Sequence, residues 1–403
     1  MIPFSPPRID DLILNEVVNT LKSGWITTGP KTKLFEMNLT NYCGNKTTLC
    51  LASATAGLEL VLRWFGVKEG DEVIVPAYTY CATANVVIHC GAKPIFVDVN
   101  ENDFNISIEK IKNAITSKTK VIMPVDFAGL PCDYDKINKL ITENEIKSKF
   151  VPETEEQKQL GRILILSDAA HSLGATMGGI KTGALTDITV FSFHAVKNLT
   201  TAEGGAIAFN LPSPFDNQTL YNHFNVLSLH GQNKDALAKT QKGNWRYDIV
   251  CAGYKCNMTD TLASIGLIEL QRYENDTLIK RKYICDKYSA AFQSKKWANI
   301  PILNTINKVS SYHLYPLRIN NCHEALRDII IQKIFDQDVS VNVHFQPVPN
   351  FSFYKQLGYK VTDYPQAFKN YECEISLPVF YNLTDDQIDT IINAVITSVE
   401  SSI

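Results

Sequence analysis

The sequence lacks any closely paired cysteines. Its ten cysteines are scattered, and the two closest, Cys251 and Cys256, have no histidine cluster beside them at the spacing of zinc ligands. A disulfide framework is typical of short secreted chains, whereas this chain has 403 residues. We therefore expect reduced thiols, no metal site and a cytoplasmic location.

Long apolar runs are also missing. No stretch approaches the roughly 18 continuous apolar residues of a membrane span. The first residues, MIPFSPPRIDD, hold three prolines and no apolar signal core. We therefore expect no membrane association.

The chain carries little net charge, because 39 Lys and Arg side chains stand against 42 Asp and Glu side chains, which gives −3. Such a balance provides no long-range field that attracts nucleic acid or an anionic membrane. An anionic ligand would have to be held by a local pocket instead. The chain also lacks a G-x-G-x-x-G motif after any strand-like run, which argues against a Rossmann oxidoreductase.

Short β-rich runs alternate with amphipathic helical stretches over the first two-thirds of the chain. Because 403 residues exceed one compact core, two domains are expected. The alternation predicts an α/β fold with a mostly parallel sheet covered on both faces. The expected strands are 73–75, 95–99, 121–125, 163–166, 188–193 and 206–209.

The last third follows another pattern. Helices near 262–270 and 326–334 surround an expected strand at 313–319, and SVNVHF (340–345) is expected to form another strand. The final helix opens with a capping box from Thr384 to Gln387. We predict a large domain over 1–265 and a small α+β domain over 266–403. The Glu-, Lys- and Gln-rich segment 142–162 is expected to be a solvated loop or charged helix at the surface.

Chemically suggestive residues stand at the carboxyl ends of the expected parallel strands, where such sheets bind ligands. Asp168 follows the strand ILIL, and Ser192 and Lys197 lie at and just past the strand ITVFSF. Ser53 can cap a helix through Thr55 and Ala56 whose free N–H groups could hold a phosphate, and Tyr78 and Tyr80 follow the strand VIVP.

Together these residue types suit pyridoxal phosphate (PLP). This cofactor needs a lysine for its Schiff base, an acid beside its pyridine nitrogen, a phosphate cradle and a flat group against its ring. The freed lysine can then move a proton as general base and acid. Each residue also has an ordinary reading: a lone Lys after a strand is usually solvated, and a lone Asp there is usually a cap or turn former.

Several motifs in order along nearly the whole chain resemble the DegT/DnrJ/EryC1/StrS family of PLP-dependent nucleotide-sugar aminotransferases. That family has the fold type I architecture, so the resemblance implies a seven-stranded large-domain sheet. The motifs are SGWITTGP (23–30), SATAGLEL (53–60), GDEVIVPAYTYCATAN (70–85), GAKPIFVDV (91–99), SDAAHSLGA (167–175), FSFHAVKNLTTAEGGA (191–206), GYKCNMTD (253–260), HLYPLRI (313–319) and SLP (376–378).

The resemblance implies cofactor roles for individual residues. Lys197 matches the Schiff-base lysine, Asp168 the partner of the pyridine nitrogen, and His171 the residue near the PLP hydroxyl. Tyr80 matches the aromatic that stacks on the ring. The implied phosphate cradle consists of Thr55, Ala56 and Ser192.

The same resemblance implies a shared site and a substrate side. Asn257 matches an asparagine that reaches the phosphate from the second subunit, so a homodimer is expected and a monomer should be inactive. The residues that match the sugar-nucleotide side are Trp25, Thr27, His313 and His344. The two histidines have an ordinary alternative as hydrogen-bonded packing residues.

The versions SGWITTGP and SFHAVKNLTTAEGGA are most similar to enzymes that aminate C4 of a nucleotide-linked 4-keto-6-deoxy sugar, with glutamate as donor. The resemblance favours a UDP-linked 2-acetamido-4-keto sugar over a dTDP sugar, in surface polysaccharide or glycan biosynthesis. The alternatives are a PLP-dependent sugar dehydratase or 3-aminotransferase on the same scaffold, and a non-catalytic regulatory protein. Lys197 argues against the dehydratases that replace this lysine with histidine.

Overall fold

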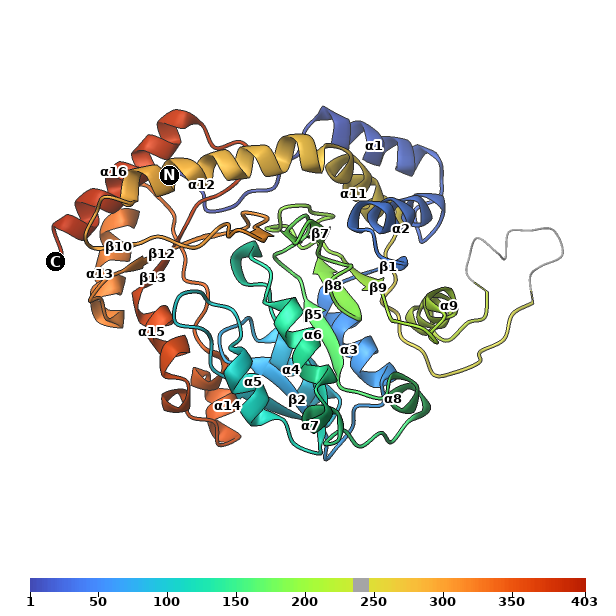
Figure 1. The fold of residues 1–403 in the computed structure, drawn as a ribbon. Coiled ribbons are helices and arrows are strands. Elements are labelled where there is room, and N and C mark those ends of the chain that lie inside the picture. Colours follow the sequence, from blue (N-terminus) through green and yellow to red (C-terminus); the bar gives the residue numbers. More distant parts are fainter. Residues whose placement is uncertain (235–245) are drawn as a thin grey trace.

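A seven-stranded sheet forms the centre of the larger part of the molecule (Figure 1). The structure is a computed structural model that describes residues 1–234 and 246–403. In order across the sheet, the strands are β1 (Thr47–Leu51), β9 (Gly205–Phe209), β8 (Ile188–Ser192), β5 (Leu164–Asp168), β4 (Thr119–Ile122), β2 (Glu72–Pro76) and β3 (Lys93–Val97). Only β9 runs antiparallel to its neighbours, so the prediction of a mostly parallel α/β sheet is confirmed.

Helices bury both faces of this sheet. Alternate residues of a strand point to opposite faces, and along β1 Leu49 and Leu51 enter one apolar core whereas Cys50 enters another. The helices of this part are α1 (Asp11–Lys22), α2 (Pro30–Cys43), α3 (Ala54–Trp64), α4 (Ala82–His89), α5 (Ile108–Ala114), α6 (Tyr134–Thr142), α7 (Asn144–Lys147), α8 (Glu155–Leu160), α9 (Asn217–Ser228) and α11 (Asp260–Arg272). Helices α1, α2 and α11 pack together at one side of the molecule (Figure 1).

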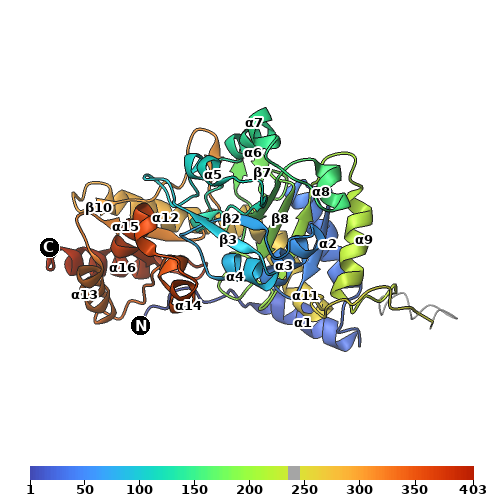
Figure 2. The same ribbon diagram turned by 90° about the horizontal axis from the view of Figure 1, so that it is seen from below.

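A second apolar core, built from residues between 284 and 399, lies at one end of the molecule (Figure 2). It surrounds a three-stranded antiparallel sheet with the order β10 (Ala298–Asn299), β12 (Tyr315–Ile319) and β13 (Glu374–Leu377). The helices that follow α11 in the sequence are α12 (Leu278–Phe292), α13 (Glu324–Phe335), α14 (Ser352–Gln356), α15 (Pro365–Cys373) and α16 (Asp385–Glu400). A further small sheet joins β11 (Lys308–Val309), β6 (Thr176–Met177) and β7 (Ile180–Lys181).

The predicted capping box at the last helix is confirmed. The Thr384 side chain accepts the N–H of Gln387, and the Gln387 side chain accepts the N–H of Thr384. Two of the first free N–H groups of α16 are thereby satisfied. The apolar face of the helix then buries Ile388, Ile391 and Val395 in the second core.

The prediction of a strand at SVNVHF was wrong, because this segment forms no ladder and makes only one bridge. Asn342 bridges Ser376 of β13, but the following backbone groups bind side chains instead of a neighbouring strand. The N–H of Val343 donates to the Asn342 side chain, and that of His344 donates to the Glu374 carboxyl group. The Tyr78 hydroxyl donates to the His344 carbonyl. The pattern of alternating apolar residues could not reveal these side-chain partners.

The charged segment 142–162 contains the two short helices α7 and α8 and is tied to the large sheet rather than projecting freely. The buried Gln157 donates from its amide to the Phe65 carbonyl at 2.8 Å. The Lys120 ammonium donates to the Val151 carbonyl at 2.6 Å. These contacts lie away from the carboxyl ends of the parallel strands.

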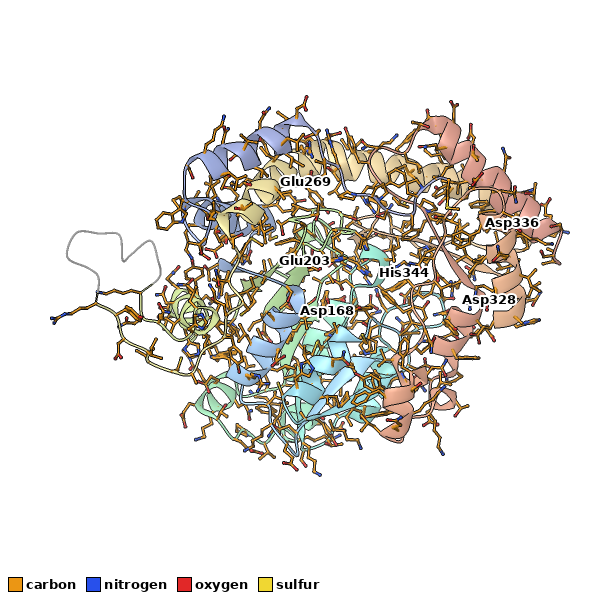
Figure 3. All side chains as sticks on the ribbon, turned by 180° about the vertical axis from the view of Figure 1, so that it is seen from behind. Asp168, Glu203, Glu269, Asp328, Asp336 and His344 are labelled. Atoms are coloured by element: carbon orange, nitrogen blue, oxygen red, sulfur yellow. The ribbon has the colours of Figure 1, made fainter. Side chains whose placement is uncertain are left out.

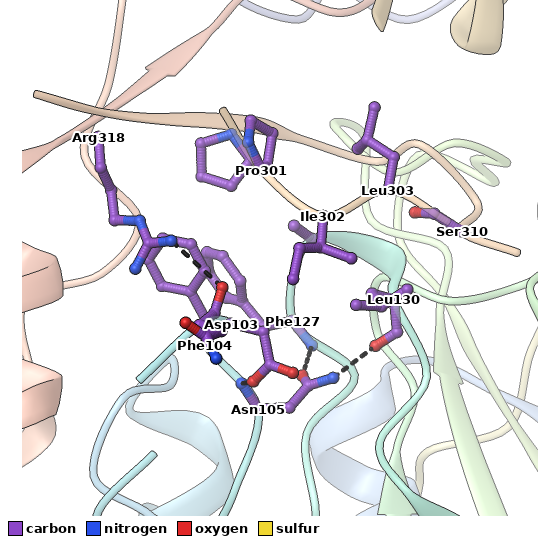
Figure 4. A pocket seen from close by; sticks show the side chains of 13 residues that line it. Asp103, Phe104, Asn105, Phe127, Leu130, Pro301, Ile302, Leu303, Ser310 and Arg318 are labelled. Carbon is purple, nitrogen blue, oxygen red and sulfur yellow. Dashed lines mark hydrogen bonds between the residues drawn. The ribbon is translucent and has the colours of Figure 1, made fainter. Parts of the chain in front are cut away.

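The part of the molecule around the large sheet meets the part around β12 along the loop that follows β3. Figure 4 shows Arg318 of β12 beside this loop, where its guanidinium donates to the carbonyls of Glu101 and Asn102 at 3.3 and 3.2 Å. Asn105 of the same loop binds the Leu130 carbonyl at 3.0 Å. The cavity between these residues measures about 20 Å³, so it has room for a water-sized group and not for a substrate.

No helix among the described residues is long and apolar enough to cross a membrane. All ten cysteines have free thiols.

Candidate active site

One cavity of about 350 Å³ opens at the carboxyl ends of the parallel strands. Eight of the residues predicted for the site line it: Thr55, Tyr80, Asp168, His171, Ser192, Lys197, His313 and His344. Asp168, Glu203 and His344 lie around the centre of the molecule although they are far apart in the sequence (Figure 3). The fold thus gathers ends of central strands and residues 313, 314, 344 and 345 from the last third of the chain around one space.

Asp168 ends β5 as a carboxylate held in an enclosed environment. Its side chain accepts the Thr83 hydroxyl at 2.7 Å and the N–H of Ala170 at 3.3 Å. Burial raises the pKa of this carboxyl, and these two hydrogen bonds and the Lys197 charge oppose that rise. A cation placed against Asp168 would therefore gain strongly from the interaction.

Lys197 lies on a turn after β8, which its own N–H closes by donating to the His194 carbonyl at 2.9 Å. Its side chain lines the cavity, and burial lowers the pKa of the amine to about 8, with Asp168 opposing the shift. A primary amine that loses its proton near neutral pH can attack a carbonyl and can exchange protons with a substrate.

The first turn of α3 points its free N–H groups at the same cavity. Ser53 is its N-cap and accepts the N–H of Ala56 at 3.1 Å. Thr55 and Ala54 line the cavity, whereas the predicted cradle residue Ala56 does not, and its N–H is taken by Ser53. With the Ser192 hydroxyl opposite, this helix start is a suitable cradle for a phosphate.

Gly205, at the start of β9, allows this helix start to lie directly on the sheet. A Cβ atom there would come within 2.3 Å of the Ala54 nitrogen and 2.5 Å of the Ser53 carbonyl carbon. Both are backbone atoms of the cradle, so a larger residue must displace the cradle itself.

We therefore expect Gly205→Ala to weaken PLP binding by about 10- to 100-fold, the effect of moving a binding group by about 1 Å. Titration of the apo protein with PLP measures it. Gly204→Ala is the matched control, since it adds the same methyl group one residue earlier, where its Cβ would meet side-chain atoms of Thr201 and Met258 and not the backbone of the cradle. Equal affinities of both variants would contradict this explanation.

Three histidines face the cavity with defined ring orientations. The Nδ1 atom of His171 accepts the N–H of Ala128 at 3.3 Å, so Nε2 carries the proton of the neutral ring. The Nδ1 atom of His313 lies 2.8 Å from the side-chain oxygen of Asn198. The side-chain nitrogen of Asn198 donates to the Ser311 carbonyl, which fixes the orientation of this amide. His313 therefore keeps its proton on Nδ1 and presents Nε2 as an acceptor.

Burial keeps these rings neutral. Desolvation is the largest cause that lowers the pKa of His171 and His313 well below the usual value, and Lys197 adds to it. Burial also lowers the pKa of His344 to about 3. At neutral pH the three rings act as hydrogen-bond donors and acceptors, and not as cations.

Tyr80 stands at the mouth of the cavity. Its side chain is 62% exposed, and its ring lies 5.9 Å from the ring of Phe345. An exposed aromatic ring beside a cavity of this size can cover a flat ligand.

The structure does not bring Trp25, Thr27 and Asn257 to this cavity. The Asn257 amide donates to the Thr28 hydroxyl at 2.5 Å, and the Trp25 indole donates to the Thr28 carbonyl at 3.2 Å. Thr27 is exposed next to them. These residues gather on the side formed by α1, α2 and α11, outside the cavity of their own chain.

Several residues that touch the predicted site were not expected from the sequence. Thr83 binds Asp168, Asn198 orients His313, and Phe345 and Glu203 line the cavity. Asn198 directly follows Lys197, so its place in the motif was a usable signal. Thr83 is 85 residues from Asp168, and no local pattern connects them.

The residues present fit PLP. Lys197 could supply the amine, Asp168 a buried carboxylate for the pyridine nitrogen, and α3 with Ser192 the phosphate cradle. His171 could offer an N–H for the ring hydroxyl, and Tyr80 an aromatic face. Each chemical group of the cofactor thus has a partner of suitable type around one cavity.

Comparisons with known proteins agree with this chemistry. The model of the DegT/DnrJ/EryC1/StrS aminotransferase family matches residues 7–149 and 151–396. The solved structure of the putative sugar aminotransferase Spr1654 from Streptococcus pneumoniae, in its PMP form, is 46% identical with a TM-score of 0.96, and each chain covers 100% of the other. Its PLP form is 44% identical with a TM-score of 0.94, over 100% of this chain and 99% of that one.

Two further relatives carry functional names. The spore coat polysaccharide biosynthesis protein SpsC of Bacillus subtilis (strain 168) is 36% identical over 398 residues, which are 98% of this chain and 96% of SpsC. Helicobacter pylori PseC, an aminotransferase involved in the biosynthesis of pseudoaminic acid, is 27% identical with a TM-score of 0.86 over 99% of both chains.

Proposed function

This chain belongs to the DegT/DnrJ/EryC1/StrS aminotransferase family and is a PLP-dependent sugar aminotransferase, and we propose that it moves the amino group of glutamate onto C4 of a nucleotide-linked 4-keto-6-deoxy sugar. The favoured acceptor is a UDP-linked 2-acetamido-4-keto sugar, with a dTDP sugar as the second candidate. Its product would enter surface polysaccharide or glycan synthesis. The names of SpsC and PseC support this direction.

The observation that carries the proposal is the meeting of Lys197 and Asp168 in one enclosed cavity. When bound, PLP supplies an electron sink for the carbon that bears the amino group. Asp168 would hold a proton on the pyridine nitrogen, because a buried carboxylate stabilises an adjacent cation. Lys197 would hold the cofactor through its amine and, once freed, would carry the proton between the two carbons that exchange the amino group.

The remaining residues orient and enclose the reacting groups. His171 would donate from Nε2 to the ring oxygen, Tyr80 would cover the ring, and α3 with Ser192 would hold the phosphate. His313 and His344 present ring nitrogens to the sugar side of the cavity. Two half-reactions on one site follow, the first taking the amine from glutamate and the second giving it to the keto carbon.

Absorbance spectra of the purified protein with PLP, before and after glutamate, test the first half-reaction. The amine-loaded protein is then mixed with UDP- and dTDP-4-keto sugars, and the product is identified by mass spectrometry and NMR. A 4-amino sugar is expected. A 3-amino sugar or a dehydrated product would replace the proposal by one of the alternatives on this scaffold, and absence of PLP binding would favour a regulatory role.

We also propose a homodimer in which each site is completed by Asn257, Trp25 and Thr27 of the other copy. These residues lie together outside the cavity of their own chain. The elements around them expose apolar side chains that a monomer would leave in water: Leu14, Val18 and Leu21 of α1, Ile26, and Leu34 and Met37 of α2.

Mixing two inactive variants tests the shared site. Lys197→Ala removes the lysine, and Asn257→Asp places a like charge against the phosphate. When the two variants are unfolded and refolded together in equal amounts, half of the dimers contain one chain of each variant. Each of these mixed dimers has one intact site. The mixture should therefore recover about a quarter of the wild-type activity, whereas each variant alone stays inactive. No recovery in dimers that contain both chains would contradict the shared site.

A further inference from the structure

Glu374 and Ser376 face the same side of β13, since alternate residues of a strand share a face. Ile375 and Leu377 point the other way into the second apolar core. The segment that carries His344 runs along the free edge of β13, where Asn342 pairs with Ser376 at 2.8 and 3.2 Å. Both polar side chains of the strand are therefore turned toward His344.

A continuous chain of hydrogen bonds joins Glu374 to the cavity. The Ser376 hydroxyl contacts one oxygen of the Glu374 carboxyl group, and the same hydroxyl lies 2.9 Å from Nδ1 of His344. The other Glu374 oxygen accepts the N–H of His344 at 2.9 Å. Nδ1 is thus occupied, and Nε2 has no hydrogen-bond partner in the described part of the chain, so it is available to a ligand in the cavity.

His344 is held firmly in this position. Its carbonyl accepts the Tyr78 hydroxyl at 2.5 Å, and its ring stacks on Phe4, with centroids 5.5 Å apart and planes inclined by 24°. The ring cannot turn over without breaking the contact with Ser376. A change in protonation at this site can therefore move the ring proton between Nδ1 and Nε2 more readily than it can move the ring itself.

From this geometry we propose that Glu374, acting through the Ser376 hydroxyl, determines which tautomer of His344 faces the substrate. Glu374 and Ser376 are positioning residues, and the proposal rests on the proposed function only in taking the cavity ligand to be the sugar substrate. With a protonated Glu374, the carboxyl donates to Ser376 and Ser376 donates to Nδ1, so Nε2–H is a donor. With an ionised Glu374, Ser376 donates to the carboxylate, Nδ1–H donates to Ser376, and Nε2 becomes an acceptor.

The change between these two states releases one proton. Nε2 loses a proton to the cavity, the Ser376 proton moves to Nδ1, and the Glu374 proton moves to Ser376. Each proton advances by one place, and the negative charge ends on Glu374. The imidazole is neutral in both states, in agreement with its lowered pKa of about 3.

The buried surroundings of Glu374 place this change within reach of ordinary pH. Burial raises the pKa of this carboxyl to about 8, opposed by its hydrogen bonds and by two arginines. The charged and titratable groups that face Glu374 are Arg318 on β12, Arg327 on α13, Tyr78 after β2 and Cys373 on α15. Those that face His344 are Lys197, His171 and His313. Below pH 8 the donor tautomer therefore prevails, and above pH 8 the acceptor tautomer prevails.

The variant Glu374→Gln separates this effect from the titration of Lys197, whose pKa also lies at about 8. The amide oxygen must accept the N–H of His344, so the amide nitrogen donates permanently to Ser376 and fixes the donor tautomer. In wild type, kcat/KM for the sugar should fall about tenfold between pH 7 and 9 beyond the fall in Glu374→Gln, because about nine-tenths of the group keeps its proton one unit below its pKa and only about a tenth one unit above it. Glu372→Gln, near the end of α15, is the matched control and should follow wild type.

Nitrogen NMR of the holoenzyme labelled with ¹⁵N-histidine provides a readout that does not depend on turnover. The eight histidines give few signals, and His344 is identified by the signal lost in His344→Gln. We expect the proton to move from Nε2 to Nδ1 between pH 7 and 9.5 in wild type and to stay on Nε2 in Glu374→Gln. Ser376→Ala should remove the difference between wild type and Glu374→Gln.

An unchanged tautomer in wild type, or a tautomer in Glu374→Gln that follows wild type, would overturn the proposal even if the sugar is aminated. A tautomer that moves as expected in a protein that aminates no keto sugar would leave the inference standing and refute the proposed function.

Discussion

Lys197→Ala should lower the rate of amine transfer by at least ~10⁴-fold, since loss of a group that both binds the cofactor covalently and transfers protons combines two catalytic effects. The structure gives the reason, because Lys197 is the only lysine that lines the cavity among the described residues. Single-turnover kinetics with glutamate measure the rate, and the absorbance of the PLP–lysine linkage should vanish.

A loss of folding cannot explain this result, because burial of the charged amine destabilises the folded state. The folded pKa of about 8 lies below the usual lysine value of 10.5, so the charged lysine destabilises the folded state below pH 8, and stability is regained between pH 8 and 10.5. At pH 7 the Tm of apo Lys197→Ala should therefore not be lower than that of wild type. Lys197→Arg keeps a charge beside Asp168 but cannot lose its proton; if it retained more than about a tenth of the activity, the lysine's role would be only electrostatic.

Much of the fold was predictable because local chemistry and global packing agree. The strands at the centre of the sheet are short apolar runs followed by polar residues, and Ser53 and Thr384 cap the helices that they were expected to cap. The antiparallel direction of β9 also had a signal in the sequence. Only residues 193–204 separate it from β8, and they hold no helix of the kind that a parallel connection needs.

The contacts that define the site between distant segments were not predictable in the same way. Lys197 and Asp168 could be proposed as partners because Asp168 ends β5 and Lys197 follows β8, and these two strands are parallel neighbours in one sheet. The bond from Thr83 to Asp168 and the chain from Glu374 through Ser376 to His344 join segments that only the folded backbone brings together. The wrong strand prediction at 340–345 has the same origin, since its backbone is satisfied by distant side chains.

The second large effect is expected at Asp168, where shape and charge can be separated. Asparagine has nearly the same shape and can still accept the Thr83 hydroxyl, which Asp168 accepts at 2.7 Å. It cannot, however, stabilise a protonated pyridine nitrogen. Asp168→Asn should therefore lower the rate of amine transfer from glutamate by about 10²–10³-fold, the effect of removing one buried electrostatic partner of the transition state.

The stability of the same variant should move in the opposite direction. Burial raises the folded pKa of Asp168 above its unfolded value, so the folded state without cofactor loses stability as the pH rises through the range between the two values. At pH 7 the Tm of apo Asp168→Asn should equal or exceed that of apo wild type. Added PLP should raise the Tm of wild type by more than it raises the Tm of Asp168→Asn. Thr83→Val is the matched control: it removes a hydrogen bond to the carboxylate but leaves the charge, so its rate should fall by no more than about tenfold, as expected for one hydrogen bond. If Asp168→Asn kept its rate, or lost rate and Tm together, Asp168 would be a structural residue and the assignment of the pyridine-nitrogen partner would fail.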